Sequence, residues 1–276
     1  MACGHDTGCQ VSGEGGGEPA KMLVLPYAAH PTGAARRMAN PLWKRVEKSP
    51  PYKKAKLLFK RLSGKELWLR EDVRVPTAPY GDWRINTALL NRDSTVYSLG
   101  VGDNIDLDLG LIADVGCEVH AFDPTPSTGT WLAAKTLPPR FHFHPWAVTD
   151  ADGTMTLYPR VKKDGTLDHV MYTLVPEDAA RNHGIGVPAV TVATAMQSLG
   201  HTRLDLLKMD IEGAEYAVLE SALALDPMPT QVLVEFHHRF AGIGVAKTAA
   251  IIERLRAVGY GIMGVSASGR EVSFSR

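Results

Sequence analysis

The chain has 276 residues, and its 30 Lys and Arg balance its 30 Asp and Glu, so the formal net charge is zero. A zero net charge argues against a globally basic nucleic-acid binder, and we expect no nucleic-acid partner. No apolar run reaches the roughly 18–20 residues of a membrane span, and the N-terminus lacks the apolar core of a signal peptide. Three cysteines are too few for a disulfide framework, so we expect a cytoplasmic location.

The charges are unevenly distributed. Residues 36–74 carry 13 Lys and Arg against 4 Asp and Glu, and the rest of the chain carries the balancing negative charge. In this region the helical spacing of Ala55, Leu58, Phe59 and Leu62 predicts a basic amphipathic helix that ends at the following Ser-Gly pair. Two explanations stay open: a basic helix that packs against an acidic domain, or a segment that contacts an anionic surface or acceptor carrier.

Three regions are expected along the chain. Residues 1–20 contain six glycines and no hydrophobic periodicity, which predicts a disordered tail. Residues 21–92 form a basic accessory segment that carries the amphipathic helix. Residues 93–276 form the main domain, because strand-like and helix-like runs alternate there.

This alternation predicts an α/β fold with a parallel sheet and helices on both faces. The expected strands cover 95–100, 118–123, 141–148, 153–158, 205–210 and 231–236, followed by a closing pair after residue 259. The expected helices cover 104–115, 127–137, 214–223 and 245–258. No helix separates the closing pair, which predicts an antiparallel hairpin at one sheet edge.

Residues that directly follow the strands are candidates for one site, because open α/β sheets bind ligands beyond the carboxyl ends of their strands. After the first strand, Gly100 and Gly102 allow a tight turn and a close approach to a ligand, and Asp103 and Asn104 lead into the next helix. The third glycine of the dinucleotide fingerprint is absent, and Ile105 stands in its place. This disfavours a nicotinamide-dependent enzyme.

An acid follows the second strand. Asp123, followed by Pro124, lies about twenty residues after the glycines, where a carboxylate can accept both hydroxyls of a ribose. At the end of the third strand, Ala147 lies where an adenine edge could bind. The glycine turn and the acid together favour a nucleoside-bearing cofactor.

Carboxylates and histidines follow the fourth and fifth strands. Asp210 is expected at a strand tip facing the crevice, whereas Glu212 could serve the site or stabilise the next helix N-terminus. Glu235, His237 and His238 end the fifth strand, and alternation sends the two histidines to opposite faces. Histidines placed in this way are suited to general-base work near neutral pH.

Six segments carry a resemblance to a known family. They are VYSLGVGDNIDLDLGLI (96–112), CEVHAFDPTP (117–126), AVTDADG (147–153), RLDLLKMDIEGAEYAVL (203–219), VLVEFHHRF (232–240) and GYGIMGVSASGREVSF (259–274). Together they resemble the FkbM-family S-adenosylmethionine-dependent methyltransferases. KMDIEGAE is the most specific part, and FDPTP and EFHHRF are similar to a bacterial branch. The resemblance spans about residues 80–276.

The resemblance implies a Rossmann-like seven-stranded methyltransferase sheet, mostly parallel with an antiparallel edge hairpin, and S-adenosyl-L-methionine as methyl donor. By position, Gly100 and Gly102 pass beneath the methionine portion. Asp123 takes the ribose hydroxyls. The residues assigned to cofactor binding are Gly100, Gly102, Asp103, Asn104, Asp123, Pro124, Ala147 and Asp210.

Known family members methylate hydroxyls on sugars and natural products, so the resemblance implies O-methylation of a small-molecule or glycan acceptor. A hydroxyl acceptor must lose its proton, and we predict that His237 or His238 is the base. Asp210, Glu212 and Glu235 are expected to orient that base or to bind acceptor hydroxyls. The acceptor pocket is expected in the N-terminal region and in a variable loop at 159–188. Its polar residues are Arg160, Lys162, Lys163, His169, Tyr172 and Arg181.

Three alternatives stay open. A divalent metal held by Asp210, Glu212, His237 and His238 is the less favoured mechanism, and no metal is expected. A nicotinamide-dependent Rossmann oxidoreductase is the second. A non-catalytic module that binds a cofactor or a partner is the third.

Overall fold

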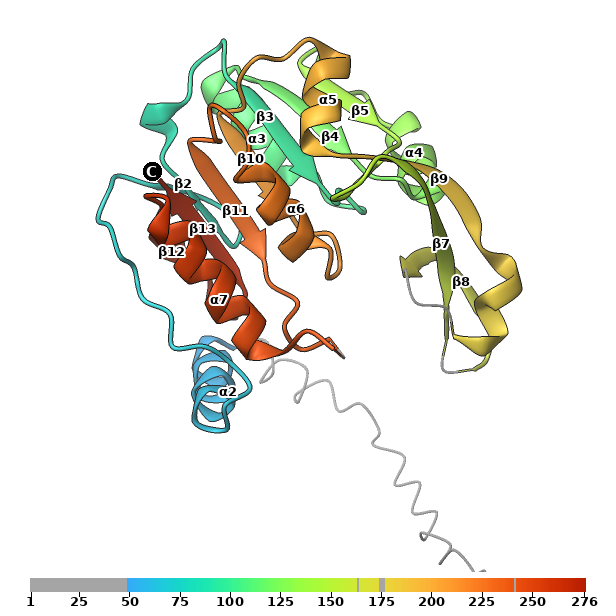
Figure 1. Cartoon of the computed structure of the whole chain (residues 1–276), viewed down its shortest axis with the longest axis horizontal. Coiled ribbons are helices and arrows are strands. Elements are labelled where there is room, and N and C mark those ends of the chain that lie inside the picture. Colours follow the sequence, from blue (N-terminus) through green and yellow to red (C-terminus); the bar gives the residue numbers. More distant parts are fainter. Residues whose placement is uncertain (1–48, 163, 174–176, 241) are drawn as a thin grey trace, which may run out of the picture. The chain divides into compact units, whose positions relative to one another are not determined.

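The structure is a computed structural model that describes residues 49–162, 164–173, 177–240 and 242–276 (Figure 1). These residues belong to one compact unit. The expected disordered tail at 1–20 lies outside the described residues, as does the part of the basic region before residue 49. None of the helices in the described ranges is both long enough and apolar enough to cross a bilayer.

The described chain begins with the predicted basic helix. Helix α2 spans Pro50–Leu62 and places its prolines in the first turn, where a helix leaves N–H groups unbonded in any case. It ends at Ser63, whose N–H donates to the carbonyl of Phe59, and Gly64 follows with φ of 67°. The predicted helix and its end are confirmed.

Short elements that the sequence pattern did not predict follow α2. They are β1 (Ala78–Tyr80), β2 (Trp83–Ile85) and the 3-10 helix η1 (Thr87–Leu89). Ile85 and Trp83 are buried in the core. The backbone N–H of Asn86 donates to Gln231 Oε1 at 2.8 Å, and Gln231 Nε2 donates back to the Asn86 carbonyl at 3.1 Å. The residues of the expected accessory segment that follow α2 therefore contribute to the core of the main domain.

A seven-stranded sheet in the order β12-β13-β11-β10-β3-β4-β5 forms the centre of the fold (Figure 1). Its strands are β3 (Thr95–Leu99), β4 (Glu118–Phe122), β5 (Phe141–His144), β10 (Leu206–Met209), β11 (Gln231–Glu235), β12 (Gly261–Val265) and β13 (Glu271–Ser275). Neighbours from β11 to β5 pair in parallel, whereas β13 runs antiparallel to both β11 and β12.

The expectation of a mostly parallel sheet is therefore corrected to a mixed sheet. The closing antiparallel pair is confirmed. However, β13 lies between β11 and β12 and runs antiparallel to both of them. The connection between β12 and β13 is too short for a parallel crossover, which needs a dozen or more residues, so the second strand returns antiparallel.

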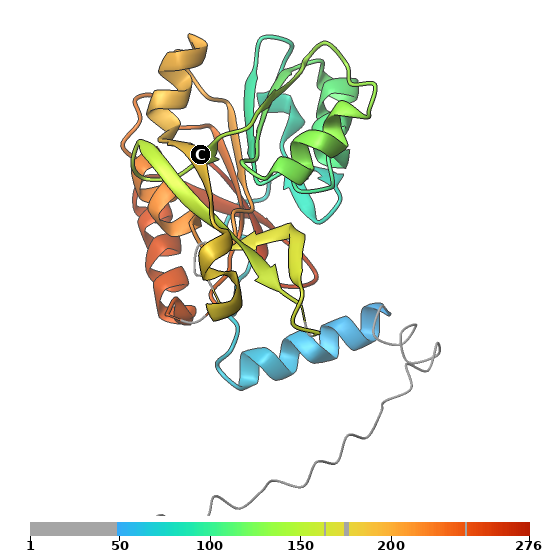
Figure 2. The same ribbon diagram turned by 90° about the vertical axis from the view of Figure 1, so that its right-hand side faces the viewer.

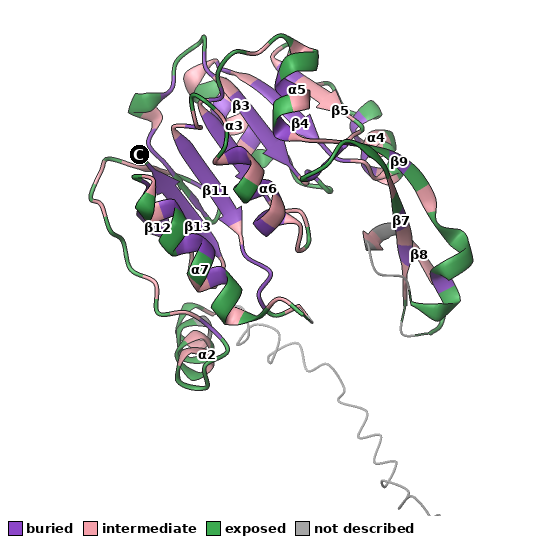
Figure 3. Cartoon of the chain, viewed as in Figure 1, coloured by how far each residue is buried: buried purple, intermediate pink, exposed green. Residues whose placement is uncertain are grey.

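Helices cover both faces of the sheet, as predicted (Figures 2 and 3). They are α3 (Asp106–Val115), α4 (Pro126–Ala133), α5 (Val192–Leu199), α6 (Glu215–Ala222) and α7 (Gly244–Ala257). Val192, Leu219 and Ile252 bury the inner sides of α5, α6 and α7 in one core cluster. Leu111 and Leu132 bury α3 and α4 in a second cluster. Helix α5 was not among the helices expected from the sequence.

A second sheet, in the order β6-β9-β7-β8, is formed by the part of the chain between β5 and α5. Its strands are β6 (Ala147–Val148), β7 (Gly153–Val161), β8 (Leu167–Thr173) and β9 (Ile185–Val190), and the 3-10 helix η2 spans Asp178–His183. The single strand expected at 141–148 is wrong, because Pro145 separates β5 from β6 and cannot donate to a ladder. The loop expected at 159–188 is also wrong, because β8 and most of β9 form there.

Four imidazoles gather where β4 and β5 meet the loop after α5. The rings of His142, His144 and His201 lie 4.7, 5.3 and 4.4 Å from the ring of His120. Burial, followed by the neighbouring imidazoles, lowers the pKa of His120 to about 3 and that of His144 to about 4. Near neutral pH the rings of His120 and His144 are therefore uncharged, and both pack as sheet residues.

This cluster predicts acid sensitivity. In the unfolded chain a histidine binds a proton below its ordinary pKa of about 6.5, whereas folded His120 and His144 stay neutral to about 3 and 4. The free energy of unfolding should therefore fall as the pH drops from about 6.5 towards about 4. His120→Phe should flatten this slope, measured by urea unfolding at several pH values. An unchanged slope in the variant would show that His120 is not a source of the acid sensitivity.

Candidate functional site

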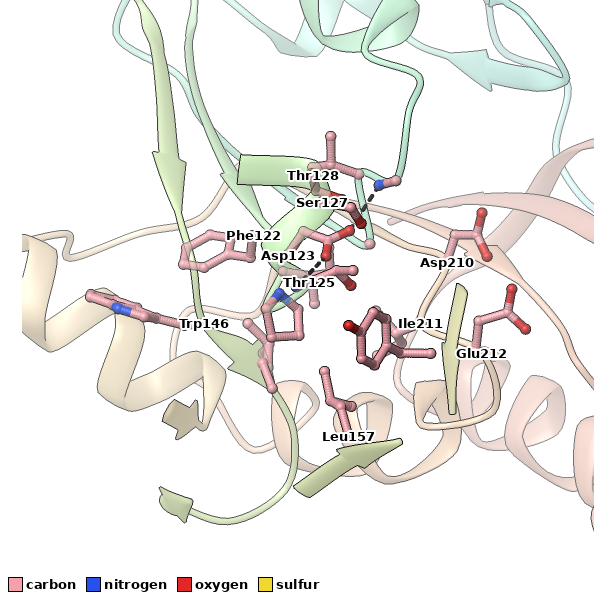
Figure 4. A pocket seen from close by; sticks show the side chains of 18 of the residues that line it. Phe122, Asp123, Thr125, Ser127, Thr128, Trp146, Leu157, Asp210, Ile211 and Glu212 are labelled. Carbon is pink, nitrogen blue, oxygen red and sulfur yellow. Dashed lines mark hydrogen bonds between the residues drawn. The ribbon is translucent and has the colours of Figure 1, made fainter. Parts of the chain in front are cut away.

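A pocket of about 810 Å³ opens beyond the carboxyl ends of β3, β4 and β10 (Figure 4). The chain leaves β3 for β4 on one side and returns to β10 on the other, so the pocket lies at the switch point of the strand order. The second sheet contributes Met155, Leu157, Arg160 and Tyr172 to its wall. The pocket therefore combines the ends of parallel strands with a separate wall from β7 and β8.

The glycine turn is pressed against the loop after β10. Gly100 has φ of 75°, and a Cβ added there would lie 1.7 Å from the carbonyl oxygen of Asp210. Lys208 Nζ donates to the Gly100 carbonyl at 2.8 Å. Gly102 has φ of 57° but open space where a Cβ would stand. Gly100 is thus required by packing, and Gly102 by backbone conformation.

Asp123 ties the second strand to this turn. Its Oδ2 accepts from the N–H of Gly102 and its Oδ1 from the N–H of Thr125, both at 2.8 Å. The side chain is buried but lines the pocket. A carboxylate has about four acceptor positions, so two remain for a ligand.

The structure brings all eight residues assigned to cofactor binding to this pocket. Its lining includes Gly100, Gly102, Asp103, Asn104, Asp123, Pro124, Ala147 and Asp210. Phe122 and Trp146 lie on the side opposite Asp210 and Glu212 (Figure 4). One side of the pocket is therefore aromatic and the other is acidic.

His237 lies behind the acidic side. Its side chain is buried, and its Nε2 lies 3.8 Å from one oxygen each of Asp210, Glu212 and Glu235. Contacts of 3.8 Å are longer than hydrogen bonds, so the ring nitrogen is surrounded by negative charge without being bonded to it. Asp210 and Glu212 separate His237 from the pocket, because they line it and His237 does not.

Glu215 orients the His237 ring. Its Oε1 lies 2.6 Å from His237 Nδ1 and also accepts from the N–H groups of Ile211 and Gly213 at 3.2 Å. The Glu215 side chain is fully buried, and its Oε2 has no partner among the described residues. A carboxylate bonded to Nδ1 directs Nε2 towards Asp210 and Glu212.

Electrostatics favour the protonated form of His237. Burial alone lowers its pKa, but the hydrogen bond to Glu215 and the charges of Glu215, Glu212 and Glu235 together raise the pKa above its usual value. Burial, followed by the charges of Asp210 and Glu271, raises the pKa of Glu235. His237 therefore holds its proton more tightly than an exposed histidine does.

The backbone at Glu212 is strained. Its φ is 52°, and it is the only residue other than glycine with a positive φ in the described ranges. Such a conformation costs about 1–3 kcal/mol and persists where the surrounding structure imposes it. Here it brings the Glu212 carboxylate to the pocket and within 3.8 Å of His237.

The same side chains could hold a divalent cation. Asp210, Glu215 and His237 each bring one ligand atom within 4.8 Å of the others. Carboxylate oxygens and an imidazole nitrogen are ligands that several divalent metals accept.

The sequence matches the Methyltransferase FkbM domain over residues 90–262. The chain belongs to the FkbM methyltransferase family. A human protein, "Probable methyltransferase-like protein 24", is 27% identical over 179 residues, which cover 63% of this chain and 41% of that protein. Its rat counterpart is 26% identical over 163 residues, which cover 58% of this chain and 37% of that protein. The matched region thus spans about two fifths of these relatives.

The structure does not bring His238 to the pocket of this FkbM domain. Its Nε2 lies 3.0 Å from Glu66 Oε1, and both side chains are buried on the side of the fold that receives the segment after α2. Strand alternation explains the difference, because His237 and His238 leave the chain in opposite directions. In the structure His238 packs with Glu66, and its role as the base stays a prediction.

Two supporting residues of the FkbM site were missed. Lys208 stabilises the glycine turn, and Glu215 orients His237. For Lys208 the sequence offered a signal, because a lysine stands near the end of an expected buried strand. The second depends on a contact across 22 residues of sequence, which no local pattern reveals.

The expected acceptor residues divide into two groups. Arg160 and Tyr172 line the pocket, whereas Lys162 and Arg181 do not. Lys163 and the side chain of His169 lie outside the described residues.

The two glycines of the turn make a matched test of this packing. Gly100→Ala forces a Cβ into the Asp210 carbonyl and should lower the free energy of unfolding by roughly 2–5 kcal/mol. Gly102→Ala meets no neighbouring atom and should lower it by only about 1–2 kcal/mol, the cost of a positive φ. Urea unfolding of both variants measures the difference. Equal losses of unfolding free energy in the two variants would show that the Asp210 carbonyl does not exclude a side chain at position 100.

Proposed function

We propose that this chain is an S-adenosyl-L-methionine-dependent O-methyltransferase that acts on a hydroxyl of a small molecule or glycan. Family membership supports methyl transfer. The observation that carries the finer proposal is the pocket itself. It has the glycine turn and Asp123 at one end, and at the other Asp210 and Glu212 stand in front of a buried His237.

The residues present fit this cofactor. Asp123 lines the pocket and has about two acceptor positions beyond its two hydrogen bonds, which suits two ribose hydroxyls. The turn at Gly102 leaves open space where a side chain would stand, which allows close approach of a ligand. Phe122 and Trp146 offer apolar surface for a purine. When bound, S-adenosylmethionine supplies an activated methyl group on a sulfonium, which leaves as a neutral thioether.

The chain's first task is alignment. In-line displacement requires the acceptor oxygen, the methyl carbon and the sulfur to lie on one line, and such positioning contributes up to about 7–11 kcal/mol. Asp210 lines the pocket next to the Gly100 turn. Asp210 and Glu212 bind the acceptor hydroxyl there by accepting its hydrogen bond.

The second task is proton removal. The hydroxyl proton passes to the Asp210 or Glu212 carboxylate that accepts its hydrogen bond, and from that carboxylate to Nε2 of His237, which Glu215 directs towards them. A positioned base adds about 10²–10⁴-fold to the rate. Because His237 must be neutral to accept this proton, its raised pKa moves the active range to higher pH.

The acceptor is expected to be polar. Arg160 and Tyr172 line the wall formed by the second sheet, and Arg160 is a cation in a pocket whose other charged residues are Asp103, Asp123, Asp210 and Glu212. A hydroxylated acceptor that also carries a polar or anionic group suits this wall.

Two alternatives are weaker. The family match favours methyl transfer over a nicotinamide-dependent oxidation. A divalent cation between Asp210, Glu215 and His237 is the second mechanism that a specific observation supports. In that case the cation would polarise the acceptor oxygen, and His237 would be its ligand rather than the base.

The pH dependence of the rate tests the role of His237. With an acceptor identified by labelled-product detection, kcat should rise with pH through the raised pKa of His237. Glu215→Gln keeps the size of the side chain but removes the charge, so the rise should move to lower pH. His237→Ala should lower kcat by about 10²–10⁴-fold with little change in S-adenosylmethionine affinity.

His183→Ala is the matched control, because His183 is exposed on η2 and should leave the rate unchanged. A normal rate for His237→Ala, or the same profile in Glu215→Gln and the native chain, would contradict the base assignment. Loss of activity in a strong chelator, restored by a divalent metal, would favour the metal mechanism instead.

A further inference from the structure

The large hydrophobic side chains that the structure leaves exposed gather in one segment. Four of the five in the described ranges lie between residues 58 and 68, and the fifth, Leu89, is 40% exposed. The exposed fractions are 49% for Leu58, 70% for Phe59, 72% for Leu62 and 56% for Trp68. Scattered single apolar residues are ordinary on a surface, but a concentration of this kind marks an interaction site.

Helix α2 turns this apolar face away from the domain. Leu57 lies on the opposite side and points to the β12–β13 turn, where its Cδ1 would be 2.9 Å from a Cβ at Gly269. Leu58, Phe59 and Leu62 are spaced i, i+1 and i+4 and share the outward side. In Figure 1 α2 lies at the lower edge of the described ribbon, below α7.

Trp68 is held beside this face by Arg61. The Arg61 Nε donates to the Leu67 carbonyl at 2.9 Å, and its guanidinium carbon lies 5.3 Å from the centre of the Trp68 ring. A tryptophan fixed next to a cation has one apolar part and one polar edge, the combination found at membrane–water interfaces.

The surroundings of the apolar face are basic. A groove of about 550 Å³ beside α2 has four cations and one acid in its lining, which are Lys54, Arg61, Arg70, Arg74 and Glu71. The other two acids between residues 54 and 74 are already paired. Glu66 pairs with His238, and Asp72 pairs with Arg256 at 2.8 Å. Positive charge is therefore in excess around α2, in a groove on its Leu57 side.

We infer that α2 and the basic groove beside it form a peripheral docking site for an anionic lipid surface. An amphipathic helix with aromatic and leucine side chains on one face and lysines at its flanks binds in the plane of such a surface. The apolar side chains enter the headgroup region, while Lys54 and Lys56 stay with the anionic headgroups.

A lipid surface fits better than a second copy of the chain or a peptide. Two copies would bring like charges together at this face. A helical or extended peptide needs a groove or a sheet edge to receive it, whereas the apolar residues here stand on the convex side of a helix. Lipid docking at α2 is independent of the chemistry proposed for the pocket.

Cosedimentation of the full chain with vesicles tests this inference. Binding should be at least about tenfold stronger to phosphatidylcholine vesicles that contain phosphatidylserine than to phosphatidylcholine alone, and it should weaken as salt rises. Phe59→Glu combined with Leu62→Glu should lower binding by at least about tenfold. Lys54→Glu combined with Lys56→Glu should remove the preference for phosphatidylserine.

Two controls carry single changes of the same kinds elsewhere. Leu89→Glu alters the remaining exposed leucine, and Lys162→Glu alters an exposed lysine near the β7–β8 turn. Both should bind like the native chain, and all variants should keep its unfolding midpoint. Three outcomes would overturn the inference: no binding by the native chain, equal binding to both vesicle types, or equal losses in the α2 variants and the controls. Absence of binding together with a dimer in light scattering would assign the face to a second copy.

Discussion

The contact between the Gly100 turn and the Asp210 carbonyl organises the rest of the site. No side chain fits between them, so β3 and β10 end side by side and their following loops share one pocket. Lys208 reinforces the contact from within the sheet by donating to the Gly100 carbonyl. Asp123 adds a link from β4 through the Gly102 N–H. Three strand ends are thus held as one unit before any ligand binds.

Negative charge is the second constraint, and it explains the buried histidine. Asp210, Glu212, Glu215 and Glu235 surround His237, and Arg270 pairs with Glu235 at 2.6 Å. Acids packed so closely repel one another, and a proton on His237 relieves part of that repulsion. The strained backbone of Glu212 shows that the fold maintains this arrangement at an energetic cost. A site built in this way is suited to receiving a proton from a neutral hydroxyl.

Sequence reasoning found the features that local pattern determines. The buried apolar runs located the strands of the main sheet, and the glycines and Asp123 after them located one pocket. Sequence reasoning failed where contacts between residues far apart in the sequence determine the role of a side chain. Glu215 acquires its role only when β11 brings His237 beside it, and His238 differs from His237 only in the face it takes. Most of the second sheet was missed because its strands are half exposed and have no continuous apolar run.

Labelled-product detection tests the proposed O-methylation most directly. The full chain is incubated with trideuteromethyl S-adenosylmethionine and extracts of metabolites, glycans and lipids, and products are sought by mass spectrometry. We predict that the label is transferred to oxygen of a hydroxylated acceptor, and that transfer disappears with His237→Ala. Label on nitrogen or carbon would contradict O-methylation. Tight S-adenosylmethionine binding without a labelled product across this range would contradict the enzyme itself.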